Sequence, residues 1–340
     1  MAKRLGREYS VGVGIEGSAV RGIPADPQFW IPLSEAPGIE NRVTLIEDKQ
    51  GYGVIEDSVD VQDANKWADG SITGRVRIKS IGLFLLNIFG TCNTTPNSPV
   101  GYNTHVFTVQ QGNQHPSFTI GIADPQAGDI GHPLGMIEKL EIKAELEEPI
   151  VFTADLVAKQ SESFAVTPAF PTTPELIFTA KDMKAYFAAT AAALSDDSPT
   201  NVKSATIRFL TPLEKDFILG SEDPNDINNT IFGIEIEITK SYIDTTFKGY
   251  FLGATGRAMR LRIASGATEK LQITLNQVKL MDWSKTPDLD GLMTETLLFR
   301  AHFKLADSKM AQATLINTQT SYVEGIGGSQ LSARAKIAAA

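Results

Sequence analysis

Apolar and polar residues alternate with a period of two along many short segments of the chain. In residues 231–242 (IFGIEIEITKSY), Ile234, Ile236 and Ile238 alternate with two glutamates and a threonine. This spacing places the apolar side chains on one face of a β-strand and the polar ones on the other. Strands of this kind indicate antiparallel sheets that are covered on one side only. Further strand candidates are residues 71–80, 138–146, 245–252 (TTFKGYFL) and 270–283.

Helical signals are scarce by comparison. Residues 81–89 (IGLFLLNIF) predict one short helix, and Gly90 follows it in a position that suits a left-handed cap. Residues 180–194 (AKDMKAYFAATAAAL) leave two structures open. Their alanines favour a helix, whereas the alternation over residues 183–188 suits a strand.

A proline-rich stretch interrupts the strand pattern at residues 166–176 (VTPAFPTTPEL). Its prolines favour an extended linker, and a chain of 340 residues is long enough for two domains. We therefore predict a mainly β fold made of two related antiparallel β-sandwich or barrel domains, each with at most a short flanking helix. The N-terminal domain would span residues 1–170, the second domain residues 171–325, and a flexible tail residues 326–340.

Composition and charge narrow the function classes. Hydrophobic residues make up 42% of the chain and charged residues 21%, as in folded globular proteins. The formal net charge of -9 argues against general nucleic-acid binding, which requires a basic surface. The longest apolar run, residues 81–90, is about half as long as a membrane-spanning helix, so we expect no membrane segment. The single cysteine, Cys92, cannot form a disulfide within the chain.

Residues 12–17 (GVGIEG) match the G-x-G-x-x-G pattern of dinucleotide-binding turns. That motif requires a preceding strand and a following helix, but polar residues precede Gly12 and prolines interrupt the chain after Gly17. We therefore predict no cofactor site here. The glycines at 12, 14 and 17 instead suit an N-terminal arm that adopts positive φ and lies close to a neighbouring backbone. Besides Gly12, Gly14 and Gly17, this arm contains Glu16, which would make its polar contact.

No pattern of catalytic or metal-binding residues stands out. The four histidines lack the spacing of a zinc motif, and we interpret them as solvated or hydrogen-bonded residues. The chain contains neither a G-x-S-x-G nucleophile motif nor a phosphate-binding lysine motif. We predict no catalytic residue, no cofactor and no metal, and an enzyme whose site is assembled from distant residues remains an open alternative.

The order of several segments resembles the major tail tube proteins of long-tailed, siphovirus-type bacteriophages. The Gly-x-Gly-x-Glu stretch is followed by a proline segment, an acidic glycine-containing segment, a strand with a short helix that ends in Phe-Gly, and a His-x-Phe hairpin with the sequence PSFT. LQITLNQVKLMDW and TETLLFRAHF are similar to the family's closing strands. The resemblance covers most of residues 9–305, whereas residues 180–230 and the alanine-rich end depart from it.

This resemblance implies a structural role in the virion and no enzymatic activity. Members of the family form a twisted β-sandwich or barrel with a flanking helix, join edge to edge into rings, and stack the rings into a tube that delivers the genome. The implied partners are a tape-measure protein, tail terminator and distal tail proteins, and DNA that passes without specific binding. Assembly would take place in the host cytoplasm. Two domains per chain would give rings of three with pseudo-sixfold symmetry, and one domain would give rings of six.

Under this interpretation, two groups of charged residues are candidate functional sites. An acidic lumen would keep DNA from adhering to the wall, and the polar strand faces carry the candidate lumen residues, which would otherwise face outside solvent. These candidates are Glu141, Glu145, Glu235 and Glu237. The acidic segment 42–63 would make contacts between rings or else form an ordinary mobile loop. Its candidate contact residues are Arg42, Glu47, Asp48, Asp57 and Asp60.

A second class of function is a carbohydrate- or receptor-binding β-sandwich module. Such a module would carry an exposed aromatic platform, and the wide spacing of Trp30, Trp67 and Trp283 disfavours one. Electron microscopy of the purified protein would separate the two classes, because only a tube protein forms rings or hollow tubes.

Overall fold

The structure, a computed structural model, describes residues 8–17, 21–50, 53, 55, 57–58, 60–125, 128–173, 175–266, 268–287 and 291–322. Its strands pair antiparallel throughout, which confirms a mainly antiparallel β fold. The helices are α1 (Ile81–Phe89) and α2 (Thr246–Leu252). The strands are β1 (Ser10–Ile15), β2 (Phe29–Ile31), β3 (Glu40–Asp48), β4 (Asp60–Arg75), β5 (Gly90–Thr95), β6 (Asn103–Val109), β7 (Phe118–Ala123), β8 (Ile130–Glu145), β9 (Val151–Ala158), β10 (Glu162–Ser163), β11 (Met183–Ala188), β12 (Ser204–Leu210), β13 (Leu213–Asp216), β14 (Asp226–Asn229), β15 (Gly233–Ser241), β16 (Arg257–Ser265), β17 (Glu269–Thr286), β18 (Thr294–Ala301) and β19 (Ala311–Asn317).

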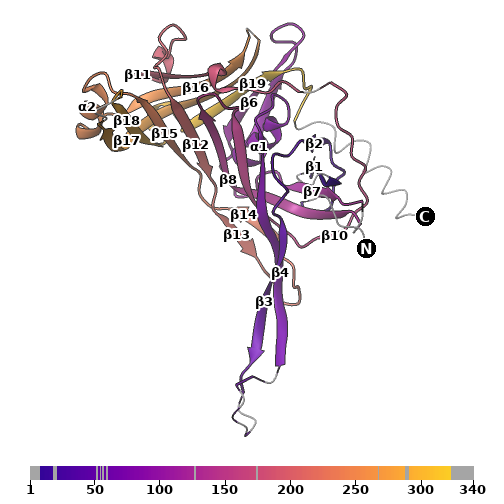
Figure 1. Cartoon of the computed structure of the whole chain (residues 1–340). Coiled ribbons are helices and arrows are strands. Elements are labelled where there is room, and N and C mark those ends of the chain that lie inside the picture. The colour runs from indigo at the N-terminus through magenta and orange to yellow at the C-terminus, as the bar shows by residue number, and fades with distance from the viewer. Residues whose placement is uncertain are drawn as a thin grey trace.

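One large sheet runs through both halves of the chain (Figure 1). Its first half has the strand order β3–β4–β9–β8, and its second half has the order β12–β15–β18–β17. The halves meet where residues 139–145 of β8 pair with residues 204–210 of β12. The two halves thus share one hydrogen-bonded sheet, and their division into two domains at residue 170 stays a prediction.

Smaller groups of strands and the two helices pack on one face of this sheet. β7, β1 and β2 extend from the first part of β8, and β16 and β11 extend from the first part of β17. β19 links β17 to the β6–β5 hairpin. The main hydrophobic core lies between these layers and contains residues of both halves.

Helix α1 lies inside this core, as the apolar sequence of residues 81–89 predicts. All of its residues are buried, because its side chains meet strands on several sides. The ring of Phe84 lies 4.7 Å from that of Phe152 in β9, and the ring of Phe89 lies 5.6 Å from that of Phe209 in β12. Gly90 ends the helix with a φ of 85°, a left-handed conformation that glycine adopts without strain. The helix therefore connects the packing of the two halves.

Most strand predictions are confirmed, above all in β8, β15 and β17. The open question at residues 180–194 is settled in favour of a strand, because β11 lies there between two short 3₁₀ turns. Residues 76–80 are not a strand, since β4 ends at Arg75. Val76 and Ile78 are nevertheless buried in the core, so the alternation marks burial correctly there but not strand length.

The strand prediction for residues 245–252 is wrong, because this segment forms α2. Phe247, Tyr250 and Phe251 stand three and four residues apart, which places them on one side of a helix. All three pack against the main core. A run rich in threonine and aromatic residues has high strand propensity, and this tertiary packing outweighs it.

Matched glycines in the two helices predict opposite effects of alanine substitution. A Cβ atom at Gly82 of α1 would collide with the buried ring of Tyr322, whereas a Cβ at Gly249 of α2 meets no atom within 4 Å. We expect Gly82→Ala to lower the free energy of unfolding by about 1–3 kcal/mol, because overpacking displaces core side chains. Gly249→Ala should raise it by roughly 0.5–1 kcal/mol, because alanine is the better helix former. Urea unfolding measures both changes, and effects of the same sign would contradict this packing.

Candidate functional site

The other face of the large sheet carries half-exposed polar residues over its central strands. β8, β12 and β15 align these residues in rows because their registers match. The alternate residues, such as Ile142, Ile207 and Ile236, are buried in the core. The rows are Glu141–Arg208–Glu235, Lys143–Thr206–Glu237 and Glu145–Ser204–Thr239. The four glutamates predicted from the sequence therefore lie together on one face.

Arg208 stands between two of these glutamates and binds both. Its Nε lies 2.9 Å from a carboxylate oxygen of Glu141, and its Nη1 lies 3.2 Å from one of Glu237. Lys139 approaches the same Glu141 oxygen to 3.4 Å. Partial burial opposes ionisation of Glu141, but the hydrogen bonds and charges of Arg208 and Lys139 outweigh it and lower the pKa of this carboxyl. The network ties three neighbouring strands together.

Charged residues of both signs are mixed on this face. Acidic and basic side chains occur in similar numbers, and serine and threonine occupy most other positions. The acidic residues include Asp69, Glu141, Glu145, Asp155, Glu235, Glu237 and Asp282, and the basic residues include Arg42, Arg75, Lys139, Lys143, Arg208, Lys279 and Arg300. Opposite charges compensate each other, so the face offers no basic stripe that would hold phosphates. Its acidity is also weaker than the four glutamates alone suggest.

Residues 42–48 and 60–63 of the acidic segment belong to a β3–β4 hairpin that projects from the body of the molecule (Figure 1). Arg42 lies near its base and binds Asp69 at 2.8 Å. Glu47 and Asp57 both approach Lys49, at 2.8 Å and 3.7 Å. Asp48 and Asp60 face each other in the strand register. The described residues therefore build a strand pair, and contacts of this hairpin with another ring stay a prediction.

A second hairpin, β13–β14, folds back against the base of the first. The ring of Phe217 lies 6.5 Å from that of Trp67 in β4. Lys66 donates to the carboxylate of Glu222 at 2.5 Å, and its backbone N–H donates to the carbonyl of the same residue at 2.8 Å. A small apolar cluster around Ile227 fixes the hairpin on β8 and β9.

The N-terminal glycine segment lies inside the chain's own sheet. Gly12 and Gly14 belong to β1, which pairs with β2 and β7, and Gly17 follows the strand in a half-buried position. The expected positive φ is wrong for Gly12 and Gly14, which are extended. Side chains are excluded there for another reason, because a Cβ at Gly14 would lie 2.5 Å from the Asp26 carbonyl oxygen. A role of this segment as an arm on a neighbouring subunit stays a prediction.

Glu16 ends this segment in a buried position and is 2% exposed. Its carboxylate accepts four hydrogen bonds, which replace the water that an ionised group requires. The donors are the backbone N–H groups of Gly22 (2.6 Å) and Leu134 (2.8 Å) and the hydroxyls of Ser117 (2.6 Å) and Thr119 (2.8 Å). Glu16 therefore ties the N-terminal segment to β7 and β8, which is a structural role that the sequence did not reveal.

The histidines and the surface pockets show no catalytic arrangement in the described residues. His105 and His115 are buried and hydrogen-bonded, and burial lowers the pKa of both rings. No group of three or more His, Cys, Asp or Glu in the described part of the chain is placed to hold a metal ion.

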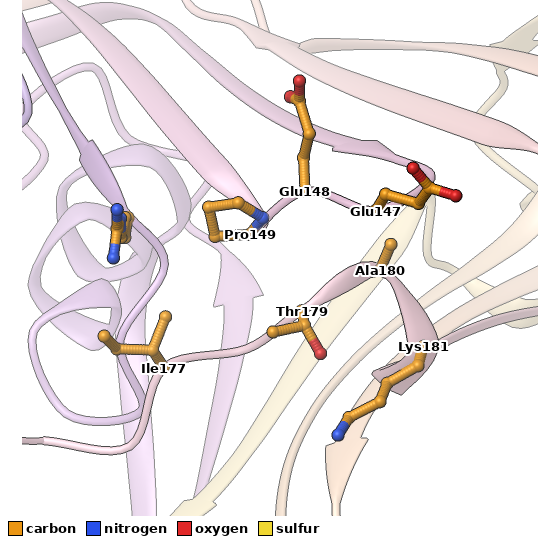
Figure 2. A pocket seen from close by; sticks show the side chains of 8 residues that line it. Glu147, Glu148, Pro149, Ile177, Thr179, Ala180 and Lys181 are labelled. Atoms are coloured by element: carbon orange, nitrogen blue, oxygen red, sulfur yellow. The ribbon is translucent and has the colours of Figure 1, made fainter.

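A surface pocket of about 560 Å³ lies where the β8–β9 turn faces the linker (Figure 2). Its lining residues are Arg75, Glu147, Glu148, Pro149, Ile177, Thr179, Ala180 and Lys181.

Comparison with known protein families identifies the family of this chain. A family model described as "Phage tail tube protein" matches residues 55–301. The match covers more than half of the chain, so the chain belongs to this family. It is a structural protein of the bacteriophage virion whose copies assemble into the tail tube, and the family is not one of enzymes. The resemblance inferred from the sequence is therefore confirmed.

Two further findings concern the chain. No curated protein sequence matches it. Among the helices of the described residues, none has the length and apolar character needed to cross a membrane.

The Glu141–Arg208 pair predicts a defined pH dependence of stability. Because the folded-state pKa of Glu141 is lowered, its contribution is present above the ordinary carboxyl value of 4.5 and is lost as pH falls through the folded pKa. We expect Glu141→Gln to lower the free energy of unfolding by about 0.5–1 kcal/mol at pH 7 and by much less at pH 3. Glu145→Gln, which removes the more exposed pair with Lys143 (2.9 Å), is the matched control and should have a smaller effect. Urea unfolding at both pH values tests this, and a difference that persists at pH 3 would rule out the ionic explanation.

Proposed function

We propose that this protein forms stacked rings whose large sheet lines the bore of the phage tail and conducts the genome to the host. The observation that carries the proposal is the continuous sheet from β3 to β17, which has a core on one face and half-exposed polar residues on the other. Such a sheet is suited to a tube wall, because the core layer faces outward and the polar face meets the contents of the bore.

Rings of three chains fit this architecture better than rings of six. Each chain supplies two four-stranded halves joined at the β8–β12 pairing. Three chains therefore supply six such halves and give pseudo-sixfold symmetry. With six chains per ring, twelve halves would surround the bore, and the circumference of the sheet would double.

The polar face supports passage of DNA without specific binding. Its mixed positive and negative charges leave no basic stripe, and the chain as a whole carries a net charge of -9. Glu141, Glu145, Glu235 and Glu237 would face the bore. The same face would meet a tape-measure protein before ejection, and tail terminator and distal tail proteins would close the two ends of the tube. The rings would assemble in the host cytoplasm.

Stacking of the rings would use the β3–β4 hairpin. It projects beyond the body and exposes charged residues together with apolar ones. The charged residues are Arg42, Glu47, Asp48, Asp57 and Asp60, and the exposed apolar residues include Val43, Leu45, Ile46 and Val61. A contact surface of this mixed character would exclude water at its centre and align two rings through ion pairs.

A carbohydrate- or receptor-binding module receives less support. Trp30 is buried, Trp67 packs against Phe217, and Trp283 lies on β17, so these tryptophans do not share one exposed platform.

Negative-stain electron microscopy of the purified protein tests the assembly. We expect rings or hollow tubes with threefold symmetry and a continuous inner wall. A protein that stays monomeric at high concentration over a wide range of salt would overturn the proposal, and sixfold symmetry with six chains would overturn the ring size.

Charge reversal on the polar face tests the assignment of the bore. Glu235→Lys combined with Glu237→Lys should leave tube assembly intact and slow DNA passage, because phosphates would bind the added lysines. DNA ejection from phage particles carrying the variant measures the rate. Glu162→Lys, on the short outlying strand β10, is the control and should leave ejection unchanged. If the double variant no longer assembles, these glutamates lie at an interface and not in the bore.

A further inference from the structure

The two halves of the large sheet repeat the same arrangement. β3–β4–β9–β8 and β12–β15–β18–β17 have the same order, and a helix follows both β4 and β15 within a few residues. β8 and β17 also share an irregularity. The register of β8 on β9 shifts between Ile137 and Lys139, and that of β17 on β18 shifts between Leu280 and Asp282. The extra residues, Glu138 and Met281, are therefore equivalent.

This equivalence identifies a strand edge that is paired in one half and open in the other. On one edge of β8, β7 pairs before the bulge and β12 pairs after it. On the equivalent edge of β17, β16 pairs before the bulge. After the bulge, residues 282–286 have no strand partner on this edge among the described residues. Four of these five residues are exposed and Trp283 is half-buried.

The counterpart of β12 is the start of β3. Arg208 of β12 faces Glu235, and Glu40 of β3 faces Asp69. Glu235 and Asp69 are equivalent positions. The β18 residue opposite Glu235 also faces Lys279 of β17, and the β9 residue opposite Asp69 also faces Met136 of β8. Lys279 and Met136 each lie two residues before the bulge of their strand.

One further hydrogen bond keeps this register before Glu40, where β3 begins, since the Gly38 N–H donates to the Ser71 carbonyl at 3.2 Å. Residues 38–42 therefore correspond to residues 206–210. Their outer edge, which in β12 pairs with β8, has no strand partner among the described residues.

We propose that residues 38–42 of one copy pair antiparallel with residues 282–286 of the next copy, in the same register as the pairing of β12 with β8 within one chain. In this register, Glu40 faces Ser284 just as Arg208 faces Glu141. Arg42 likewise faces Asp282, just as Leu210 faces Lys139. The partner is a second copy of this chain, and the proposal rests on the ring assembly proposed above.

The side chains brought together by this register are complementary. Arg42 and Asp282 carry opposite charges and share the polar face. Arg42 is 49% exposed in the single chain and already binds Asp69 at 2.8 Å, so Asp282 would complete an acid–base–acid bridge like that of Arg208. On the core face, Ile39 is diagonal to Trp283, within reach of an aromatic side chain. Both residues are half-buried, and pairing would cover them further.

The pairing also explains how the ring closes. Each copy offers one edge of each kind, so copies join head to tail and neither of these two edges remains free once the ring is complete. Closure removes exposed strand edges that would otherwise promote disordered aggregation.

Disulfide trapping tests the register in the assembled protein. Cys92 is first replaced by serine, and Glu40→Cys is combined with Ser284→Cys. Facing antiparallel residues have Cα atoms roughly 4.5–5.5 Å apart, which fits the range of disulfides. Mild oxidation should convert most subunits into covalent trimers on a non-reducing gel. The matched control combines Glu40→Cys with Thr286→Cys, two residues out of register, and should cross-link about tenfold less because its diagonal Cβ atoms lie about 7–8 Å apart.

The outcomes distinguish the two proposals. Rings that form without the expected cross-link, or with equal cross-linking of the control, overturn the register and leave the ring intact. Failure of the unmodified protein to form rings or tubes overturns the function itself. Hydrogen–deuterium exchange on the unmodified protein is a second measurement that requires no substitution. Peptides containing residues 38–42 and 282–286 should both gain protection on assembly, and unchanged exchange at either one would overturn the pairing.

Discussion

The pairing of β8 with β12 is the interaction on which the rest of the structure depends. It joins strands from the two halves of the chain over residues 139–145 and 204–210. Without it, each half would expose a long strand edge and half of a hydrophobic layer. The seam is apolar on its inner face, where Ile142 faces Ile207, and ionic on its outer face, where Arg208 binds Glu141. One strand pair thus sets both the continuity of the core and the continuity of the polar surface.

A second connection behind the sheet reinforces this seam. β6, from the first half, pairs with β19 at the end of the second half. Helix α1 lies between the two connections, and its Phe89 ring contacts Phe209 and Phe232 from the second half. This position explains why α1 is wholly buried whereas α2, its equivalent in the second half, buries only Phe247 completely. The halves share a topology, but their helices differ in burial because only α1 lies between the two connections.

The insertions differ between the halves in a way that matters for assembly. β3 and β4 project outward as a long hairpin, whereas the connection between β12 and β15 folds back as β13–β14. Trp67 and Lys66 hold the folded hairpin against the first half. In a ring of three copies, projecting and folded hairpins would alternate around the circumference. Such a ring would have pseudo-sixfold symmetry in its inner wall and threefold symmetry at its rim.

The sequence by itself determined the elements whose pattern is local. The alternation over β8, β15 and β17 and the apolar run of α1 predict which side chains are buried. Both patterns can be read from neighbouring residues, since one has a period of two and the other is a short apolar run that ends at a glycine. Tertiary structure decided what depends on distant partners. Helix α2 forms because the core accepts Phe247, and Glu16 is buried because four donors from separate segments surround it. β8 pairs with β12 although 58 residues, 146–203, separate the two strands. Edge pairing uses backbone groups that every strand carries, so no side-chain pattern specifies the partner and only the packed core does.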